Sequence, residues 1–243
     1  MVFLEFKEVM KRFGKKEVLS EVSFTVKQGE IFGLIGVSGG GKTTLLNILV
    51  GMARASGGKI LFGDKNVLRK PSYLRKAVGF ATQRNMLFEE LSLKENAFYF
   101  GKLYKMRMSD ILSRFEELTS LLGLDGFEDF QIRKFSGGMI KRANLLVSLI
   151  HNPKLLVLDE PTIGLDPLLR DILWKYIHSI NLQGTTIIVI SHLLEEIEEN
   201  CKTIGILKRG KIVALGGISQ YKRAYKNKSL SDIFEDILKN ERI

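Results

Sequence analysis

The sequence predicts an α/β fold built on a mostly parallel sheet with helices on both faces. Two observations lead to this prediction. Short apolar runs rich in Val and Ile, at residues 30–35, 154–158 and 185–190, have the length of buried strands. Between them, apolar residues recur at helical spacing. Strands that alternate with helices are typical of a parallel sheet that is covered on both sides.

Length and composition limit the class of protein. The 243 residues, 45% of them hydrophobic, suit one large domain or a core with one inserted subdomain. We find no apolar run of the roughly 18 residues that a membrane span needs. Charged residues near the N-terminus argue against a signal peptide, so we expect a cytoplasmic protein. The one cysteine, Cys201, excludes an internal disulfide and is expected to be a small buried hydrophobe on a helix.

Hairpin strands are expected in addition to the alternating strands and helices. The early region, residues 59–67 and residues 203–215 have the pattern of hairpin strands. Gly63-Asp64 and Arg209-Gly210 are the turn residues of the last two.

Two helices have predicted boundaries. An apolar stripe over residues 111–122 is expected to follow Ser109 as its cap and to stop at Gly123. A second stripe over residues 169–180 is expected to follow the cap Asp166, with Pro167 at the first helical position. Residues from about 87 to 142 are mainly helical in pattern and interrupt the series of strands, which indicates a helical insertion.

A glycine-rich loop follows the first buried strand. Residues 36–44 match G-x-x-x-x-G-K-[ST] between a strand and an apolar helix. Glycines let backbone N–H groups converge on phosphate oxygens, and the helix N-terminus adds partial positive charge. We expect Lys42 to reach the β- and γ-phosphates of ATP and the Thr43 hydroxyl to ligate Mg²⁺. The expected nucleotide-binding residues of this loop are Gly36, Ser38, Gly39, Gly40, Gly41, Lys42, Thr43 and Thr44.

Two adjacent acids end the second buried strand. Neighbouring side chains on a strand point to opposite faces, so Asp159 and Glu160 need not do the same job. A parallel sheet places such a strand end beside the phosphate loop. We expect Asp159 to hold Mg²⁺, often through water, and Glu160 to orient and deprotonate the attacking water. Without the phosphate loop, these acids would predict only a turn.

A second loop that suits an anion precedes another helix. Ser136 can cap that helix, while Gly137 and Gly138 permit a ligand to approach the backbone closely. A helix N-terminus without obstructing side chains is an anion site. One ATP-binding fold rarely needs two such helix ends.

These motifs, in this order, resemble those of the ATP-binding subunits of ABC transporters, from about residue 2 to residue 216. Residues 135–139 are similar to the signature motif of the family, and residues 158–167 are similar to its Walker B strand and D-loop. His192 resembles its switch histidine and Gln83 its Q-loop glutamine. Val37 and Met139 stand where Pro and Gln are more common, and neither change removes a phosphate-binding group.

The resemblance implies a P-loop NTPase (RecA-like) core with an antiparallel β subdomain and an inserted helical subdomain that carries the signature motif. The ATP-binding domain would span residues 1–216, with its helical subdomain at about 87–142. Residues 217–243 would form a basic tail with an amphipathic helix. In this family two subunits pair head to tail, here as a homo- or heterodimer. Each ATP then lies between the phosphate loop of one subunit and Ser136, Gly137 and Gly138 of the other.

The resemblance also implies roles for three further residues. His192 would form a hydrogen bond with the γ-phosphate and help to hold Glu160 and the water in place. Gln83 would touch Mg²⁺ and the water, although it is otherwise a surface glutamine. Phe13 would stack on adenine, although it could equally belong to the core.

As a whole, the resemblance implies an ATP hydrolase that drives transport, on the inner face of the cell membrane, through separately encoded transmembrane permease subunits. The Ser-Gly-Gly-Met form and the C-terminal stretch are more similar to exporter-type subunits. Leu87, Phe88 and Leu91 are candidates for the surface that receives the permease, or are ordinary core.

The alternative is a soluble ABC-type ATPase that acts on nucleic acid. The net charge is +10, and eight cationic residues but no acid lie between positions 202 and 228. That stretch fits either an anionic partner or a solvated surface. Proteins of the alternative class usually carry two cassettes or a long coiled coil, and neither pattern is found here. We therefore expect no nucleic-acid partner.

Overall fold

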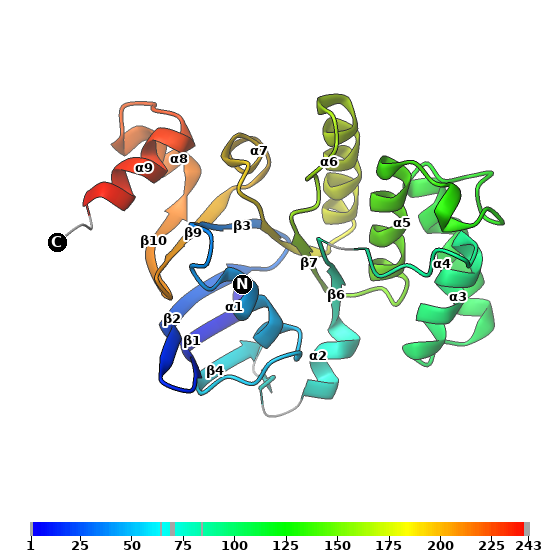
Figure 1. Ribbon diagram of the computed structural model, residues 1–243, viewed down its shortest axis with the longest axis horizontal. Coiled ribbons are helices and arrows are strands. Elements are labelled where there is room, and N and C mark those ends of the chain that lie inside the picture. Colours follow the sequence, from blue (N-terminus) through cyan, green and yellow to red (C-terminus); the bar gives the residue numbers. More distant parts are fainter. Residues whose placement is uncertain (1, 64, 69–70, 84, 241–243) are drawn as a thin grey trace. The chain divides into compact units, whose positions relative to one another are not determined.

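A computed structural model describes residues 2–63, 65–68, 71–83 and 85–240 (Figure 1). The chain divides into two compact units. The first unit comprises Met1–Arg75 and Thr186–Ile243, and the second comprises Lys76–Thr185. Helix α2 (Pro71–Ala77) runs across the boundary between them.

An antiparallel sheet opens the first unit. Its strands are β1 (Val2–Phe13), β2 (Lys16–Lys27), β4 (Gly57–Phe62) and β5 (Lys65–Asn66), in the order β2-β1-β4-β5. The inward residues of β1 and β2 alternate with exposed ones, as expected for a sheet with one buried face. Phe6 and Phe24 stack with ring centroids 4.2 Å apart, and Phe24 stacks in turn on Phe32. The expected hairpin at 59–67 is confirmed, although its turn position 64 lies outside the described residues.

The first unit also contains parallel strands. Strand β3 (Ile31–Gly36) pairs in parallel with β8 (Thr186–Ile190) and with β9 (Thr203–Lys208). Strand β10 (Lys211–Gly217) folds back antiparallel on β9. Arg209 and Gly210 have φ of 47° and 79°, the left-handed values that a tight hairpin turn requires, so the predicted turn is confirmed. The helices of this unit are α1 (Lys42–Leu49), α7 (Leu194–Asn200), α8 (Ile218–Ala224) and α9 (Leu230–Asn240).

Among the described residues, the second unit combines two parallel strands with four complete α-helices. Strands β6 (Val78–Ala81) and β7 (Leu155–Asp159) pair in parallel. The helices are α3 (Leu93–Leu103), α4 (Met108–Leu121), α5 (Gly137–Leu149) and α6 (Pro167–Leu182), with a short 3₁₀ turn, η1 (Ile132–Lys134). The helices expected between residues 87 and 142 therefore exist, whereas the division of the chain into domains stays a prediction.

One predicted helix boundary is wrong and one is confirmed. Helix α4 begins at Met108, so Ser109 lies inside its first turn and does not cap it. Arg107 stands at the cap position without a capping side-chain bond, and its guanidinium pairs with Asp110 in the first turn. Helix α6 begins as predicted, because the Asp166 carboxylate accepts the Leu169 N–H at 3.0 Å and Pro167 is the first helical residue.

Cys201 is buried, as expected, but it lies directly after α7 rather than within a helix. Burial strongly raises the pKa of its thiol, so the sulfur stays protonated and behaves as a small hydrophobe.

Candidate nucleotide site

The loop between β3 and α1 has a shape that only glycine permits at two positions. A side chain at Gly36 would place its Cβ 2.1 Å from the Leu207 carbonyl oxygen. Gly41, the residue before α1, has a φ of 107°, and a Cβ there would lie 2.7 Å from a methyl group of Leu19. The close approach of β9 and β2 to the loop therefore fixes its path.

The backbone of β9 and its turn also supports this loop. The Gly210 N–H donates to the Gly40 carbonyl at 3.1 Å, and the Gly210 carbonyl accepts the Ser20 N–H at 2.8 Å. The sequence did not predict this support, because backbone N–H and C=O groups are common to nearly every residue and leave no pattern.

The ammonium group of Lys42 lies inside the curve of the loop. Its Nζ donates to the Gly36 carbonyl at 2.7 Å and to the Val37 carbonyl at 3.1 Å. Lys42 is also the first residue of α1, whose N-terminal N–H groups have no capping side chain. Ser38, Gly39 and Thr43 are exposed, while Gly40 and Gly41 are buried and Thr44 is half-buried. The loop thus presents a cation, hydroxyl groups and a helix N-terminus together, as an anion site requires.

Strand register brings His192 to the same edge of the sheet. Leu34 of β3 is paired with Ile190 of β8, and His192 follows Ile190 by two residues. The carboxyl ends of parallel strands meet at one edge, so His192 and the start of the phosphate loop are neighbours. The buried Ser191 shapes the turn, because its Oγ accepts the Leu193 N–H at 3.0 Å. The His192 side chain is exposed.

In the second unit, register brings Gln83 together with the two acids. Ala81 of β6 is paired with Leu158 of β7, so Gln83 and Asp159-Glu160 lie at the carboxyl edge of the same strand pair. Gln83 is exposed, and both acids are half-buried. Carboxylate and amide oxygens at such an edge suit a hard cation such as Mg²⁺.

Glu160 has an unusual backbone and a charged neighbour. Its φ of 53° is left-handed, which is uncommon for a residue other than glycine and is typical of functional sites. Burial lowers the pKa of the Lys141 ammonium, and the negative charge of Glu160 opposes that shift. Lys141 also donates from Nζ to the Gln83 carbonyl at 3.4 Å. We did not predict Lys141 as part of this edge, because a lysine on a helix is usually a surface residue.

The loop before α5 leaves a helix N-terminus open. Ser136 caps α5 by accepting the Met139 N–H at 3.3 Å, as predicted. Ser136 and Gly137 are exposed, and a Cβ added at Gly137 would have no heavy atom within 4 Å. Gly138 is buried, and a Cβ there would lie 3.2 Å from Leu169 of α6. The open N–H groups of α5 therefore form a second place where an anion can bind.

Phe13 is 55% exposed and does not belong to the core. It ends β1, and the Lys11 ammonium lies 4.5 Å from the centre of its ring. The exposed ring is accessible for stacking. Among the proposed partner-surface residues, Phe88 is exposed, Leu91 is half-buried and Leu87 belongs to the core.

Within the described part of the chain, no helix is both long and apolar enough to cross a membrane. The same residues contain no cluster of three or more His, Cys, Asp or Glu side chains that could hold a metal ion. A Mg²⁺ ion that is held by one or two protein groups together with phosphates and waters does not need such a cluster.

Comparison with known proteins identifies the family. Residues 19–163 match the ABC transporter family. The linearmycin resistance ATP-binding protein LnrL of Bacillus subtilis is 34% identical over 88% of this chain and 68% of its own length. The Nod factor export ATP-binding protein I of Rhizobium sp. is 36% identical over 88% of this chain and 71% of its own.

The fold agrees with this assignment. A solved structure described as an ATP-binding subunit of an ABC transporter aligns with a TM-score of 0.87 and 26% identity. The alignment covers 97% of this chain and 99% of that one. The expected P-loop NTPase fold is thereby confirmed, and the comparisons give no support to a nucleic-acid ATPase. The chain belongs to the ABC transporter family and is one of its ATP-binding, ATP-hydrolysing subunits.

Proposed function

We propose that this subunit binds ATP with Mg²⁺ and hydrolyses it in a composite site shared with a second ATP-binding subunit, to power export. The phosphate loop, residues 36–44, binds the phosphates, with Lys42 at the β- and γ-phosphates and Phe13 on the adenine. Glu160 takes the proton of the attacking water, and His192 forms a hydrogen bond with the γ-phosphate. Thr43, Gln83 and Asp159 hold Mg²⁺, which supplies charge neutralisation at the phosphates when bound.

The observation that carries the composite site is the open helix N-terminus at Ser136 and Gly137. Both residues are exposed, and space lies in front of Gly137. A phosphate already has one helix N-terminus, that of α1, in the loop that contains Lys42. A second open helix N-terminus can bind the nucleotide that a partner subunit holds. We therefore propose head-to-tail pairing, in which Ser136, Gly137 and Gly138 contact the nucleotide of the other subunit.

Mixing two inactive variants tests this pairing. Lys42→Ala removes the cation of the phosphate loop, and Ser136→Arg blocks the open helix end. In a mixed dimer, one site combines the intact phosphate loop of one chain with the intact Ser136 loop of the other. We expect the mixture to regain ATPase activity, and Lys42→Ala mixed with the double variant Lys42→Ala/Ser136→Arg to stay inactive. Equal, negligible activity of both mixtures would exclude head-to-tail pairing.

A hollow on the second unit supports a separate permease as the partner. It has a volume of about 500 Å³ and lies along α3, close to the exposed Phe88. An exposed apolar hollow of this kind is typical of a surface that receives another protein. Its lining residues are Leu91, Glu95, Phe98, Tyr99, Lys102, Leu103 and Met108. We propose that transmembrane permease subunits dock here, which would hold this chain on the inner face of the cell membrane.

The direction of transport is proposed from the relatives. The names of two of them refer to Nod factor export and to linearmycin resistance, so export is the direction that we infer. Nucleic acid is not among the proposed partners. Two of the eight cations between positions 202 and 228, Lys222 and Lys228, form ion pairs with Glu198 and Asp236 of the same chain.

A further inference from the structure

Each end of helix α9 is bound by a side chain from another element. The charge of that side chain is opposite to the partial charge of the helix dipole at that end. At its N-terminal end, the Glu198 carboxylate of α7 accepts the Leu230 N–H at 2.5 Å. At its C-terminal end, the Lys208 ammonium of β9 donates to the Leu238 carbonyl at 2.9 Å. An anion at the first turn and a cation at the last turn both stabilise a helix. Two residues of the helix itself, Leu230 and Ile233, are fully buried. We call α9, residues 230–240, the strap.

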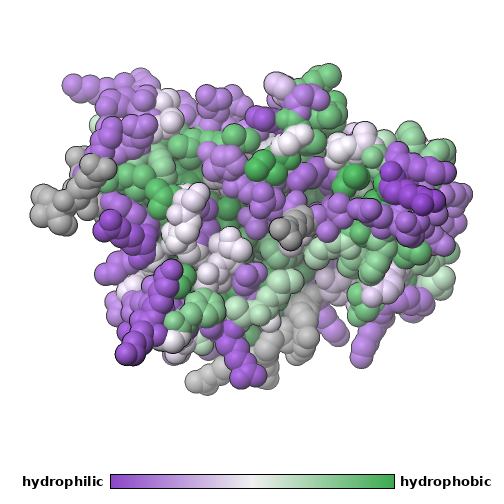
Figure 2. All heavy atoms as spheres, in the orientation of Figure 1, coloured by the Kyte–Doolittle hydropathy of each residue, from purple (hydrophilic) through white to green (hydrophobic). Residues whose placement is uncertain are grey.

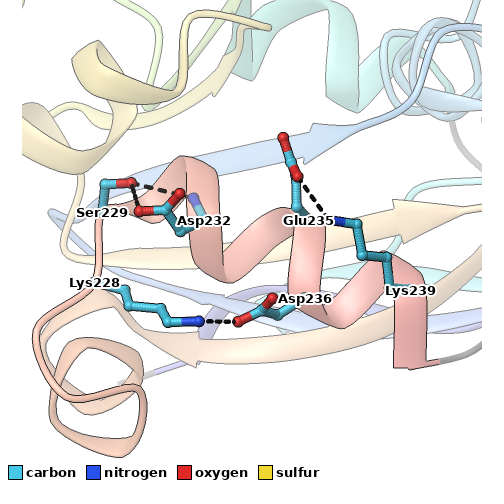
Figure 3. A network of polar contacts seen from close by, with 6 residues as sticks. All are labelled: Lys228, Ser229, Asp232, Glu235, Asp236 and Lys239. Atoms are coloured by element: carbon cyan, nitrogen blue, oxygen red, sulfur yellow. Dashed lines mark hydrogen bonds and ion pairs between the residues drawn. The ribbon is translucent and has the colours of Figure 1, made fainter.

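Polar contacts join side chains of the strap to one another and to the two residues that precede it (Figure 3). The Ser229 hydroxyl donates to the Asp232 carboxylate and accepts the Asp232 N–H, which closes the first turn. Lys228 pairs with Asp236 at 2.7 Å. One turn further, Lys239 pairs with Glu235 at 2.9 Å. Hydrophilic side chains gather over the neighbouring α8 (Figure 2). We call Glu198 and Lys208, which bind the two ends of the strap, its N-terminal and C-terminal anchors. A helix bound at both ends couples the positions of the two anchors.

The N-terminal anchor leads to His192. Glu198 lies on α7, a helix that begins two residues after His192. Ile197, next to Glu198, is fully buried, and its Cγ2 lies 2.8 Å from the place of a Cβ on Gly33. Gly33 belongs to β3, so α7 is pressed against the strand that leads into the phosphate loop. Glu198 also forms an ion pair with Lys222 of α8.

The C-terminal anchor leads to the phosphate loop itself. Lys208 follows Leu207, whose carbonyl oxygen lies against Gly36. Two residues further, Gly210 donates its N–H to the Gly40 carbonyl. Any shift of this end of β9 therefore moves the backbone that shapes the loop. All of these residues belong to the first compact unit.

We propose that the strap is a positioning device that holds the His192 turn and the phosphate loop at a fixed relative position, with Glu198 and Lys208 as its positioning residues. This inference rests on the proposed roles of His192 and the phosphate loop. The two anchors act on different partners. Loss of Glu198 affects the group that assists hydrolysis, whereas loss of Lys208 affects the loop that binds the phosphates.

Glu198→Ala and its exposed neighbour Glu199→Ala form a matched pair. Glu198→Ala should lower kcat by about 2- to 30-fold, the range of couplings carried through packed networks. The dissociation constant for ATP should change by less than about twofold, because the phosphate loop keeps its own support. Glu199→Ala should match wild type. Glu198→Gln, which keeps the acceptor for the Leu230 N–H but loses the charge pair with Lys222, should fall between them.

Lys208→Met keeps the alkyl stem and removes the donor to Leu238. We expect it to weaken ATP binding by about threefold or more, while kcat at saturating ATP stays closer to wild type than in Glu198→Ala. Lys208→Arg should restore binding, because it can donate to the same carbonyl. Lys202→Met, at the other end of β9, is the control and should bind ATP normally.

Amide hydrogen exchange of the full chain gives a readout that does not depend on activity. In Glu198→Ala, exchange should rise at Leu193 beside the His192 turn, and in Lys208→Met it should rise at Gly210. Increased exchange that is confined to α9, with kcat and ATP binding unchanged in both variants, would overturn the proposal. The strap would then only cover the surface of its unit. If the wild-type chain hydrolysed no ATP, the proposed function would fail, and exchange at these amides would still decide whether the strap positions them.

Discussion

At the scale of single residues, the position of Lys42 is the basis of its proposed role at the phosphates. Its ammonium lies between two carbonyls of the loop, at 2.7 Å and 3.1 Å, with the N-terminus of α1 directly behind it. In the proposed function, the phosphate oxygens bind beside this ammonium group. A cation placed in advance needs no reorganisation when charge develops in the transition state.

Lys42→Ala should abolish measurable ATP hydrolysis and weaken nucleotide binding. The loop would keep its backbone N–H groups but lose the cation that lies inside its curve. Titration with a fluorescent ATP analogue and a phosphate-release assay measure the two effects. Lys16→Ala, an exposed lysine at the β1–β2 turn, is the control and should match wild type. Full turnover by purified Lys42→Ala would contradict the assignment of the phosphate loop.

Glu160 is a proposed site residue whose backbone conformation the sequence did not predict. Its position after an apolar strand predicted a base beside a metal-binding acid. The left-handed φ of 53°, which costs of the order of 1–3 kcal/mol for such residues, was not predictable. Backbone strain depends on how surrounding elements hold a residue, and no local pattern records it.

At the scale of elements, the sequence predicted those whose signals are local. The three apolar runs became β3, β7 and β8, with each boundary within about one residue. Asp166 and Pro167 marked the start of α6 because capping and a fixed proline φ are local properties. The prediction of Ser109 as the cap was wrong because the helix starts two residues earlier, where Arg107 stands at the cap position and pairs with Asp110.

The remaining element contacts depend on residues that are distant in sequence. The support of the phosphate loop by Leu207 and Gly210 uses carbonyl and N–H groups, which leave no sequence pattern. The two anchors of α9 join residues 30 or more positions apart. Charge alone did not indicate these pairings, because most of the exposed lysines and glutamates look alike in the sequence.

His151 joins three elements of the second unit. It follows α5, stacks on Tyr104 at the end of α3 with ring centroids 3.6 Å apart, and shares a hydrogen bond with the Val78 carbonyl of β6. Burial lowers the pKa of His151 to about 4, and the charge of Arg114 adds to that effect while the Val78 carbonyl opposes it. The ring is therefore neutral in the folded protein at physiological pH.

Acid should destabilise the protein through His151. The unfolded ring, with a pKa near 6.5, binds a proton more readily than the folded ring. The contribution of the neutral ring to the free energy of unfolding is therefore fully present above about pH 6.5 and is lost as the pH drops toward about 4. Between pH 7 and pH 5 this one residue should cost about 2 kcal/mol of unfolding free energy. Urea unfolding at the two pH values measures it.

His151→Phe provides the comparison, because it keeps a ring against Tyr104 but cannot be protonated. Other groups contribute equally to both proteins, so the difference between the two pH dependences isolates the histidine. Its stability at pH 7 will be lower because the Val78 carbonyl loses its partner. An identical loss of stability between pH 7 and pH 5 in both proteins would contradict the lowered pKa.

At the scale of the whole molecule, the residues proposed for ATP chemistry are divided between the two compact units. The first unit supplies Lys42 and His192, and the second supplies Asp159, Glu160 and the open end of α5 at Ser136. Each unit places its groups at the carboxyl ends of parallel strands or at helix N-termini, which are general positions for binding phosphate. The proposed function therefore assigns roles to residues of both units.

The measurement that tests this account most directly is the rate of ATP hydrolysis by Glu160→Gln beside wild type, with ATP binding measured on the same samples. The glutamine keeps the size and hydrogen-bonding capacity of the side chain but cannot accept a proton. Asp159→Asn, the adjacent acid, is the comparison and should damage binding as well as hydrolysis. The account predicts that Glu160→Gln binds Mg²⁺-ATP nearly as well as wild type and hydrolyses it about 10²- to 10⁴-fold more slowly. Hydrolysis by Glu160→Gln at the wild-type rate would contradict it.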